Sequence, residues 1–188
     1  AVANTAAIDA AIPRGKVSLA ARIAPSTEAL TTTTTAQIGR EIVPGLRPLQ
    51  QGPVLYADWE TSWEDQRERM EAICKGHGIG ALPLIRYQRM RGTLEDGLPE
   101  LRAQLERMKA ALLIVDSIGF ACAADLKAPE VALAAMAGLA GLEITTLAIG
   151  HEAKEDNSLG KKKATVFGSV FFQNAARSVW HCRRADDD

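Results

Sequence analysis

The apolar positions of this 188-residue chain fall into short runs that alternate with segments of helical periodicity. Short apolar runs bounded by turn residues are typical of strands, and apolar residues spaced three and four apart are typical of amphipathic helices. Their alternation predicts an α/β fold in which helices flank a mostly parallel central sheet. The predicted strands span residues 16–23, 53–57, 84–87, 111–117, 144–150 and 178–183.

Helical segments are predicted from capping residues and apolar spacing. Ser62 can cap a helix over residues 63–75, with Gly76 just beyond its end. The apolar side of this helix is predicted to carry Trp63, Met70, Ile73 and Cys74. Further helices are predicted at residues 36–42 (AQIGREI), around the periodic run from Leu98 to Met108, at 129–142 with Pro129 in the first turn, and at 167–177.

Length and composition indicate one folded domain over residues 1–188, because the chain is long enough to bury a sizeable core. Residues 151–164 are polar and contain Gly160 and three consecutive lysines, so a mobile loop is predicted there. Residues 185–188 are predicted to be a solvated acidic tail. The hydrophobic fraction of 47% with 24% charged residues excludes disorder of the whole chain.

Net charge and cysteine spacing narrow the choice of binding partners and of cellular compartment. A net charge of −1 excludes a broadly basic surface, so any nucleic-acid contact must come from a local patch. The three cysteines lie far apart without metal-like spacing, which favours a reducing compartment. No stretch approaches the roughly 20 apolar residues of a membrane span, and the Ala-rich start does not look like a secretion signal. A cytoplasmic protein is expected.

Three predicted strands are followed by polar residues that suit catalysis: Glu60, Asp116 and His151. Ligands of open parallel sheets bind beyond the carboxyl ends of the strands, so these residues are expected to lie near a ligand. An Asp after a buried strand is what nucleotide-binding ATPases use to hold magnesium. The alternative for Asp116 is a cap of the following turn.

Glu60 is predicted to orient and deprotonate an attacking water, and the alternative is an ordinary surface carboxylate before a helix. His151 is predicted to sense a γ-phosphate, and the alternative is a structural histidine. The run Lys161, Lys162 and Lys163 can contact nucleic-acid phosphates or form a plain solvated loop. Arg177 can reach a neighbouring subunit's phosphates as an arginine finger or form a surface ion pair.

Four segments in this order, VLYADWE, ALLIVDS, LAIGHEAK and FGSVFFQNAARSVW, resemble the RecA-like P-loop ATPases of the RepA-type hexameric helicase family. The resemblance runs from about residue 15 to residue 183. It implies a RecA-like core with ATP and Mg²⁺ as cofactors. It also implies that Glu60 is the catalytic base, Asp116 the Walker B magnesium residue and His151 the phosphate sensor.

The same resemblance implies a homo-oligomer, most simply a hexameric ring, with single-stranded DNA as a partner. Lys154 and Arg177 would then act across subunit boundaries. The first hypothesis is therefore an ATP-hydrolysing motor domain of a DNA helicase or related DNA-dependent ATPase, with the lysine run facing a central DNA channel. The alternatives are a non-catalytic nucleotide-binding or scaffold subunit and a recombinase-mediator-like DNA-binding module.

The chain departs from the family at the phosphate-binding loop, where GxxxxGK[ST] is expected after the first strand. Alignment on AQIGREI places Thr31 at the lysine position and Thr32 at the Ser/Thr position that would contact phosphate and magnesium. Thr31 cannot supply a positive charge. Three accounts remain: a degenerate ATPase, a cation supplied from elsewhere such as Lys154, or residues in this stretch that differ from those of the natural chain.

Overall fold

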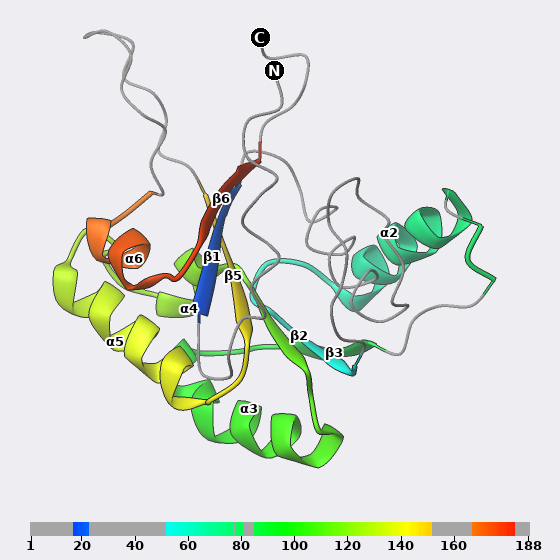
Figure 1. Ribbon diagram of the computed structural model, residues 1–188, viewed down its shortest axis with the longest axis horizontal. Helices are drawn as coiled ribbons and strands as arrows, with labels where there is room; N and C mark the ends of the chain where they lie inside the picture. The colour runs from blue at the N-terminus through cyan, green and yellow to red at the C-terminus, as the bar shows by residue number, and fades with distance from the viewer. Residues whose placement is uncertain (1–16, 23–51, 77, 81–84, 152–166, 183–188) are drawn as a thin grey trace, which may run out of the picture.

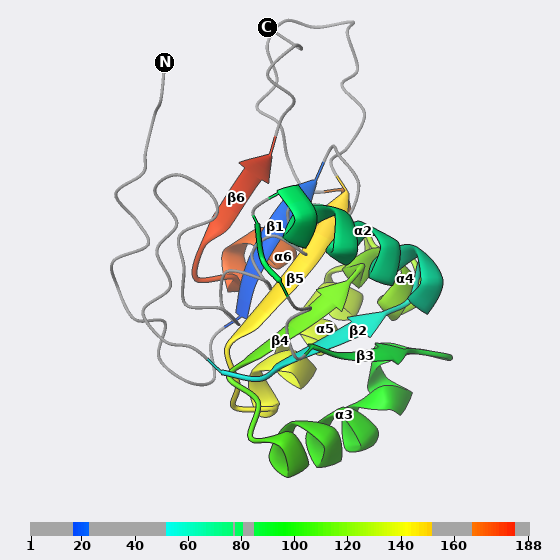
Figure 2. The same cartoon turned by 90° about the vertical axis from the view of Figure 1, so that its right-hand side faces the viewer.

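The computed structural model describes residues 17–22, 52–76, 78–80, 85–151 and 167–182. These residues form a six-stranded sheet in the order β3-β2-β4-β5-β1-β6, and every neighbouring pair is parallel. Helices cover both faces of the sheet (Figures 1 and 2). The α/β class with a parallel sheet and flanking helices is confirmed.

Each predicted strand is present within a few residues of its predicted bounds. The strands are β1 (Val17–Arg22), β2 (Val54–Asp58), β3 (Ile85–Arg89), β4 (Leu112–Asp116), β5 (Thr146–His151) and β6 (Val179–Cys182). The prediction for β3 ended at Tyr87, where the apolar pattern stops. Backbone pairing carries β3 on to Arg89, the register partner of Asp58, so the ladder and not the side-chain pattern sets this strand end.

The described helices are α2 (Trp63–Gly76), α3 (Leu94–Met108), α4 (Ile118–Cys122), α5 (Pro129–Gly141) and α6 (Val170–Ala175). The cap predicted at Ser62 is present, since its hydroxyl accepts from the Asp65 amide at 3.2 Å. Helix α3 starts earlier than its apolar run because Thr93 and Asp96 form a capping box. The five-residue α4 was not predicted, and α6 is shorter than predicted. The helix predicted at 36–42 lies outside the described residues.

One face of the sheet packs against α3, α4, α5 and α6 and carries the larger apolar cluster. Strands β2 and β4 supply Leu55, Ala57, Leu113 and Val115 to it, and α3 and α5 supply residues such as Leu101 and Leu139. Most of these side chains are fully buried. Burial of this kind contributes about 25 cal/mol per Å² of apolar surface, so this face carries most of the hydrophobic stabilisation.

The opposite face packs against α2 (Figure 2) and holds a smaller cluster of Val54, Tyr56, Met70, Cys74, Ile114, Leu147 and Ile149. The prediction that Trp63 belongs to the apolar side of α2 is wrong in part. Trp63 is 45% exposed at the first turn, although its ring packs against Tyr87. The buried side of α2 instead contains the polar Gln66, whose side-chain nitrogen donates to Tyr56, Asp58 and Thr61. Its side-chain oxygen has no hydrogen-bond partner among the described residues.

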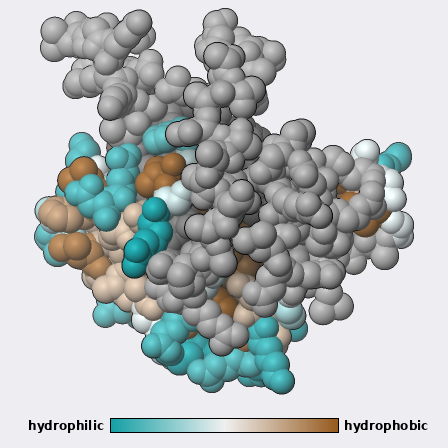
Figure 3. All heavy atoms as spheres, in the orientation of Figure 1, coloured by the Kyte–Doolittle hydropathy of each residue, from teal (hydrophilic) through white to brown (hydrophobic). Residues whose placement is uncertain are grey.

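Apolar side chains also remain at the surface. Figure 3 shows brown residues at the surface in the region of α5 and α6. The exposed large apolar residues of these elements and their neighbours are Phe120, Leu133, Phe167, Val170 and Phe171. In the described part of the chain, none of the helices has the length and apolar character needed to cross a bilayer.

Candidate functional site

The three predicted strand-end residues meet at one edge of the sheet. Asp58 is the register partner of Asp116, and Asp116 is the register partner of Ile149, so β2, β4 and β5 end side by side. Glu60 follows β2 by two residues and His151 is the last residue of β5. Their side chains are in contact, with Glu60 Oε1 3.3 Å from His151 Nε2. The structure thus brings the three residues to one edge of the sheet, with Glu60 and His151 in contact.

Glu60 and His151 are the accessible members of this group. The Glu60 side chain is 20% exposed and that of His151 is 52% exposed. A carboxylate beside an imidazole, both within reach of solvent, is a pair that can accept and hold a proton from a bound water. The arrangement suits general-base chemistry at the sheet edge.

Asp116 is the buried member, with 1% of its surface exposed. Its backbone carbonyl accepts from the Trp59 amide at 2.7 Å, which continues the β2–β4 pairing one residue past Asp58. Its Oδ2 accepts a hydrogen bond of 2.5 Å from the Tyr56 hydroxyl. The next residue, Ser117, is fully buried, and its hydroxyl has no hydrogen-bond partner among the described residues. Two buried side chains with oxygen donors, Asp116 and Ser117, thus lie at the end of β4 and directly after it.

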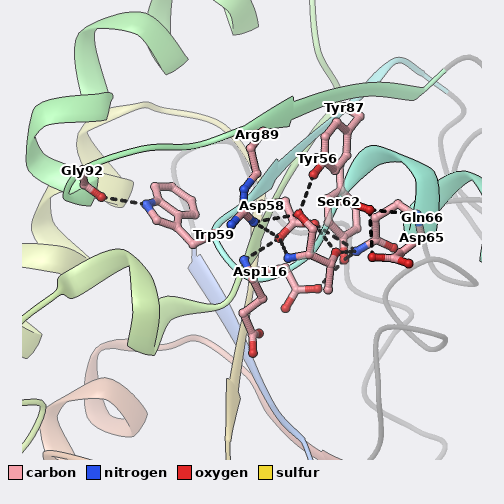
Figure 4. A network of polar contacts seen from close by, with 12 residues as sticks. Tyr56, Asp58, Trp59, Ser62, Asp65, Gln66, Tyr87, Arg89, Gly92 and Asp116 are labelled. Carbon is pink, nitrogen blue, oxygen red and sulfur yellow. Dashed lines mark hydrogen bonds and ion pairs between the residues drawn. The ribbon is translucent and has the colours of Figure 1, made fainter.

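Asp58 forms the centre of a hydrogen-bond network between β2 and α2 (Figure 4). Its Oδ1 accepts from the backbone amides of Glu60 at 2.7 Å and Thr61 at 2.8 Å. Its Oδ2 accepts from the Thr61 hydroxyl at 2.6 Å and the Gln66 amide at 3.1 Å. Several donors around one fully buried carboxylate offset the cost of its burial. Asp58 therefore shapes the turn that carries Glu60.

The edge strand β3 supports the same turn from its other side. The Tyr87 hydroxyl donates to the Thr61 carbonyl at 2.9 Å, and Arg89 Nη1 donates to it at 2.7 Å. Arg89 also lies 3.4 Å from Asp58 Oδ1. Burial, followed by the negative charge of Asp58, raises the pKa of Tyr87 to about 12. The turn after β2 is thus fixed by three elements, namely β2, β3 and α2.

The sequence reasoning missed Asp58, Tyr56, Gln66 and Arg89 as parts of the site. Asp58 gave a signal, since it is a carboxylate at the end of an apolar strand, two residues before Glu60. Tyr56 and Gln66 gave none, because an aromatic residue in a strand and a glutamine in a helix are ordinary. Their role depends on the strand register and on which side of α2 faces the sheet.

The segments with the predicted phosphate and DNA contacts are attached to this same edge. Strand β1 ends at Arg22, the register partner of His151, so the connector with Thr31 and Thr32 leaves the sheet beside His151. The segment after His151 rejoins the described chain at Phe167, whose amide donates to the His151 carbonyl at 2.7 Å. Thr31, Thr32, Lys154 and the run Lys161, Lys162 and Lys163 themselves lie outside the described residues.

Arg177 is not brought to this edge. It precedes β6, and the β6 residue Val179 pairs with Leu19 in the first half of β1. Since β6 runs parallel to β1, the chain enters β6 at the amino end of the sheet. Arg177 is exposed there, at the end of the sheet opposite Asp116. Within one chain it is therefore separate from the Glu60–His151 pair.

The donor set fits magnesium held together with a nucleotide. The described residues include no cluster of three or more His, Cys, Asp or Glu side chains that could hold a metal alone. Magnesium bound with phosphates takes only one or two protein carboxylates, and it prefers oxygen donors. The Asp116 carboxylate and the neighbouring Ser117 hydroxyl supply oxygen at the end of β4, so the residues present agree with the predicted Mg²⁺ role of Asp116.

Comparison with known proteins agrees with the fold. Residues 26–157 match the family model of an AAA domain (AAA_25). The solved structure of the KaiC-like protein PH0186 from Pyrococcus horikoshii OT3 aligns with a TM-score of 0.56 and 15% identity, covering 94% of this chain and 76% of that one. No curated protein matches the sequence. Because 314 structurally similar chains share the fold, the fold alone does not select a reaction.

Proposed function

We propose that this chain, which belongs to the AAA domain family, binds and hydrolyses ATP at the carboxyl edge of its sheet, between the ends of β2, β4, β5 and β1. The family match together with the RecA-like fold identifies an AAA-type ATPase domain. The observation that carries the proposal of hydrolysis is the placement of Glu60, Asp116 and His151 on neighbouring strand ends, with Glu60 and His151 in contact.

The roles of Asp116, Glu60 and His151 are proposed from their surroundings, and those of Thr31 and Thr32 from the resemblance. Asp116 and Thr32 would hold Mg²⁺, which neutralises phosphate charge when it is bound with ATP. Glu60, held by its backbone amide on Asp58, accepts the proton of the attacking water. His151, in contact with Glu60, senses the γ-phosphate and links that signal to the base. Thr31 would contact the phosphates from the connector after β1.

The test is replacement of Glu60 by Gln, which keeps the size and the backbone bond to Asp58 but removes the base. Turnover should fall by about 10²- to 10⁴-fold, while the affinity for Mg²⁺-ATP changes little. Glu64→Gln is a matched control, because Glu64 is an exposed carboxylate in the first turn of α2. Unchanged phosphate release in Glu60→Gln would remove Glu60 from its role.

The finer proposal is a DNA helicase motor, or a related DNA-dependent ATPase, that works as a hexameric ring. The resemblance to the RepA type supports it, and so do the exposed apolar residues over α4 to α6, since large exposed apolar residues often mark protein contacts. Lys154 and Arg177 would act on a neighbouring subunit's ATP. Arg177 suits this role because it lies away from its own chain's site.

DNA contact is proposed for Lys161, Lys162 and Lys163, which belong to the segment between His151 and Phe167. If the three lysines bind DNA phosphates, replacing them by Ala should weaken single-stranded DNA binding and reduce its salt dependence. Binding with the same affinity and the same salt slope would assign the run to plain surface.

Light scattering with and without Mg²⁺-ATP measures the oligomeric state directly.

A second function is favoured by one specific observation. Thr31 stands where the P-loop lysine is expected, so a non-catalytic subunit that keeps the fold and the oligomer contacts is the alternative. The two proposals differ in whether Mg²⁺-ATP binds and turns over. Binding without turnover, unaffected by Glu60→Gln, would favour the non-catalytic subunit.

A further inference from the structure

Tyr56 occupies a special place in the sheet, because it lies on the α2 face two residues before Asp58. Its side chain is 1% exposed. The ring stacks on the ring of Tyr87, with centroids 6.4 Å apart, and belongs to the apolar cluster with Ile114 and Met70. The rigid, buried ring leaves its hydroxyl little freedom of position. The hydroxyl therefore acts as a fixed polar group inside an apolar layer.

This hydroxyl joins two parts of the candidate site. It donates to Asp116 Oδ2 at 2.5 Å, across 60 positions of sequence. Gln66 Nε2 lies 3.3 Å from the same hydroxyl oxygen and 3.1 Å from Asp58 Oδ2. A continuous polar path therefore runs from Asp116 through Tyr56 and Gln66 to Asp58, whose Oδ1 holds the Glu60 amide (Figure 4).

We propose that Tyr56 is a positioning residue for Asp116. A hydrogen bond from a fixed hydroxyl to one carboxylate oxygen restrains rotation of the carboxylate plane, and charge-assisted bonds of this kind are among the strong ones. Tyr56 thereby fixes the orientation in which the carboxylate of Asp116 would meet a Mg²⁺–nucleotide complex, and it links that carboxylate to the turn of Glu60. This inference rests on the proposed function, in which Asp116 holds magnesium.

The decisive comparison is Tyr56→Phe against Tyr87→Phe. Tyr56 and Tyr87 are stacked on each other, and each variant removes the hydroxyl of one of them. The Tyr87 hydroxyl donates to the Thr61 carbonyl and not to Asp116. The measurement is ATP binding by calorimetry over a series of Mg²⁺ concentrations. Tyr56→Phe should raise the Mg²⁺ concentration needed for half of the Mg²⁺-dependent gain in ATP affinity by about tenfold. In Tyr87→Phe that Mg²⁺ concentration should stay within about twofold of its value in the unchanged protein. The affinity for ATP without Mg²⁺ should be unchanged in both variants.

Two further measurements separate the possible failures. The Asp116→Asn variant should lose the dependence on Mg²⁺; if it keeps that dependence, Asp116 does not hold magnesium and both proposals fall. If Asp116→Asn loses it but Tyr56→Phe behaves like Tyr87→Phe, only the positioning role is overturned. Urea unfolding shows whether Tyr56→Phe is folded. If it is not, Tyr56→Leu, which also removes the hydroxyl that donates to Asp116, takes its place, and a normal Mg²⁺ requirement in that variant would overturn the positioning role.

Discussion

The two faces of the sheet differ in how their apolar layers end. On the face beneath α3, α4 and α5, apolar residues continue to the ends of the strands and beyond, where the last core residues include Trp59 and Met90. On the face beneath α2, the apolar layer stops at Tyr56, Ile114 and Ile149, and the next positions are the buried carboxylates Asp58 and Asp116. The same strands thus carry a closed core on one side and a polar network on the other.

Because of this difference, residues that serve folding alone lie on one face of the sheet, and residues of the candidate site lie on the other. Successive side chains of a strand point to opposite faces, so alternate positions of β2 and β4 can have different functions. Asp58 and Asp116 are held by hydrogen bonds that an apolar face could not provide. Substitutions on the α3–α5 face are expected to change folding alone, whereas those on the α2 face are expected to change folding and catalysis together.

The largest combined effect is expected for Asp58→Ala. Its removal leaves the Glu60 and Thr61 amides without their acceptor, which should lower the free energy of unfolding by about 4 kcal/mol. Turnover per folded molecule should also fall, by about 10²-fold, because the turn of Glu60 is displaced. Urea unfolding and phosphate release measure the two effects. Asp58→Asn, which keeps one oxygen acceptor, should lose less of both; equal losses would contradict the network.

A core substitution on the other face should affect folding alone. Leu101, fully buried in α3, leaves a cavity when replaced by Ala, with an expected loss of about 3 kcal/mol in unfolding free energy. Leu133→Ala, at a half-exposed position of α5, should change it by less than about 0.5 kcal/mol. Turnover per folded molecule should be unchanged in Leu101→Ala. A reduced turnover in Leu101→Ala would erase the contrast between the faces.

The smallest effect concerns Tyr87 and pH. Its pKa is raised from 10.0 to about 12 by burial and then by the charge of Asp58. Between these values the unfolded chain releases the proton while the folded chain keeps it, so the stability present below pH 10 is lost as the pH rises toward 12. Tyr87→Phe should lack this part of the alkaline loss. Identical slopes of unfolding free energy from pH 9 to 12 in the two proteins would contradict it.

Much of the fold could be predicted from the sequence because each strand is a short apolar run bounded by turn or polar residues. The same pattern singled out Glu60, Asp116 and His151 as candidates, since polar residues directly after apolar runs lie at the carboxyl ends of parallel strands. Their proximity then follows from parallel pairing. Short α4 escaped prediction because five residues give no helical period, and Thr93 moved the start of α3 ahead of its apolar run.

The polar network could not be predicted, because its bonds connect residues whose distance depends on register. Tyr56 and Asp116 lie on neighbouring strands, and their contact requires that both point to the same face. Gln66 is polar on the buried side of α2, where the periodic pattern favoured Trp63. The catalytic, metal-binding and sensing roles given to Glu60, Asp116 and His151 stay predictions. So do the roles given to Thr31, Thr32, Lys154, Arg177 and the lysine run.

The most direct test is calorimetric titration of this chain with Mg²⁺-ATP, followed by phosphate release from the same preparation with and without single-stranded DNA. Binding together with turnover that depends on Glu60 is the predicted result, and it would mean that Thr31, a neighbouring cation or both serve in place of the P-loop lysine. A folded sample that binds no ATP at millimolar concentration would contradict the proposed ATPase.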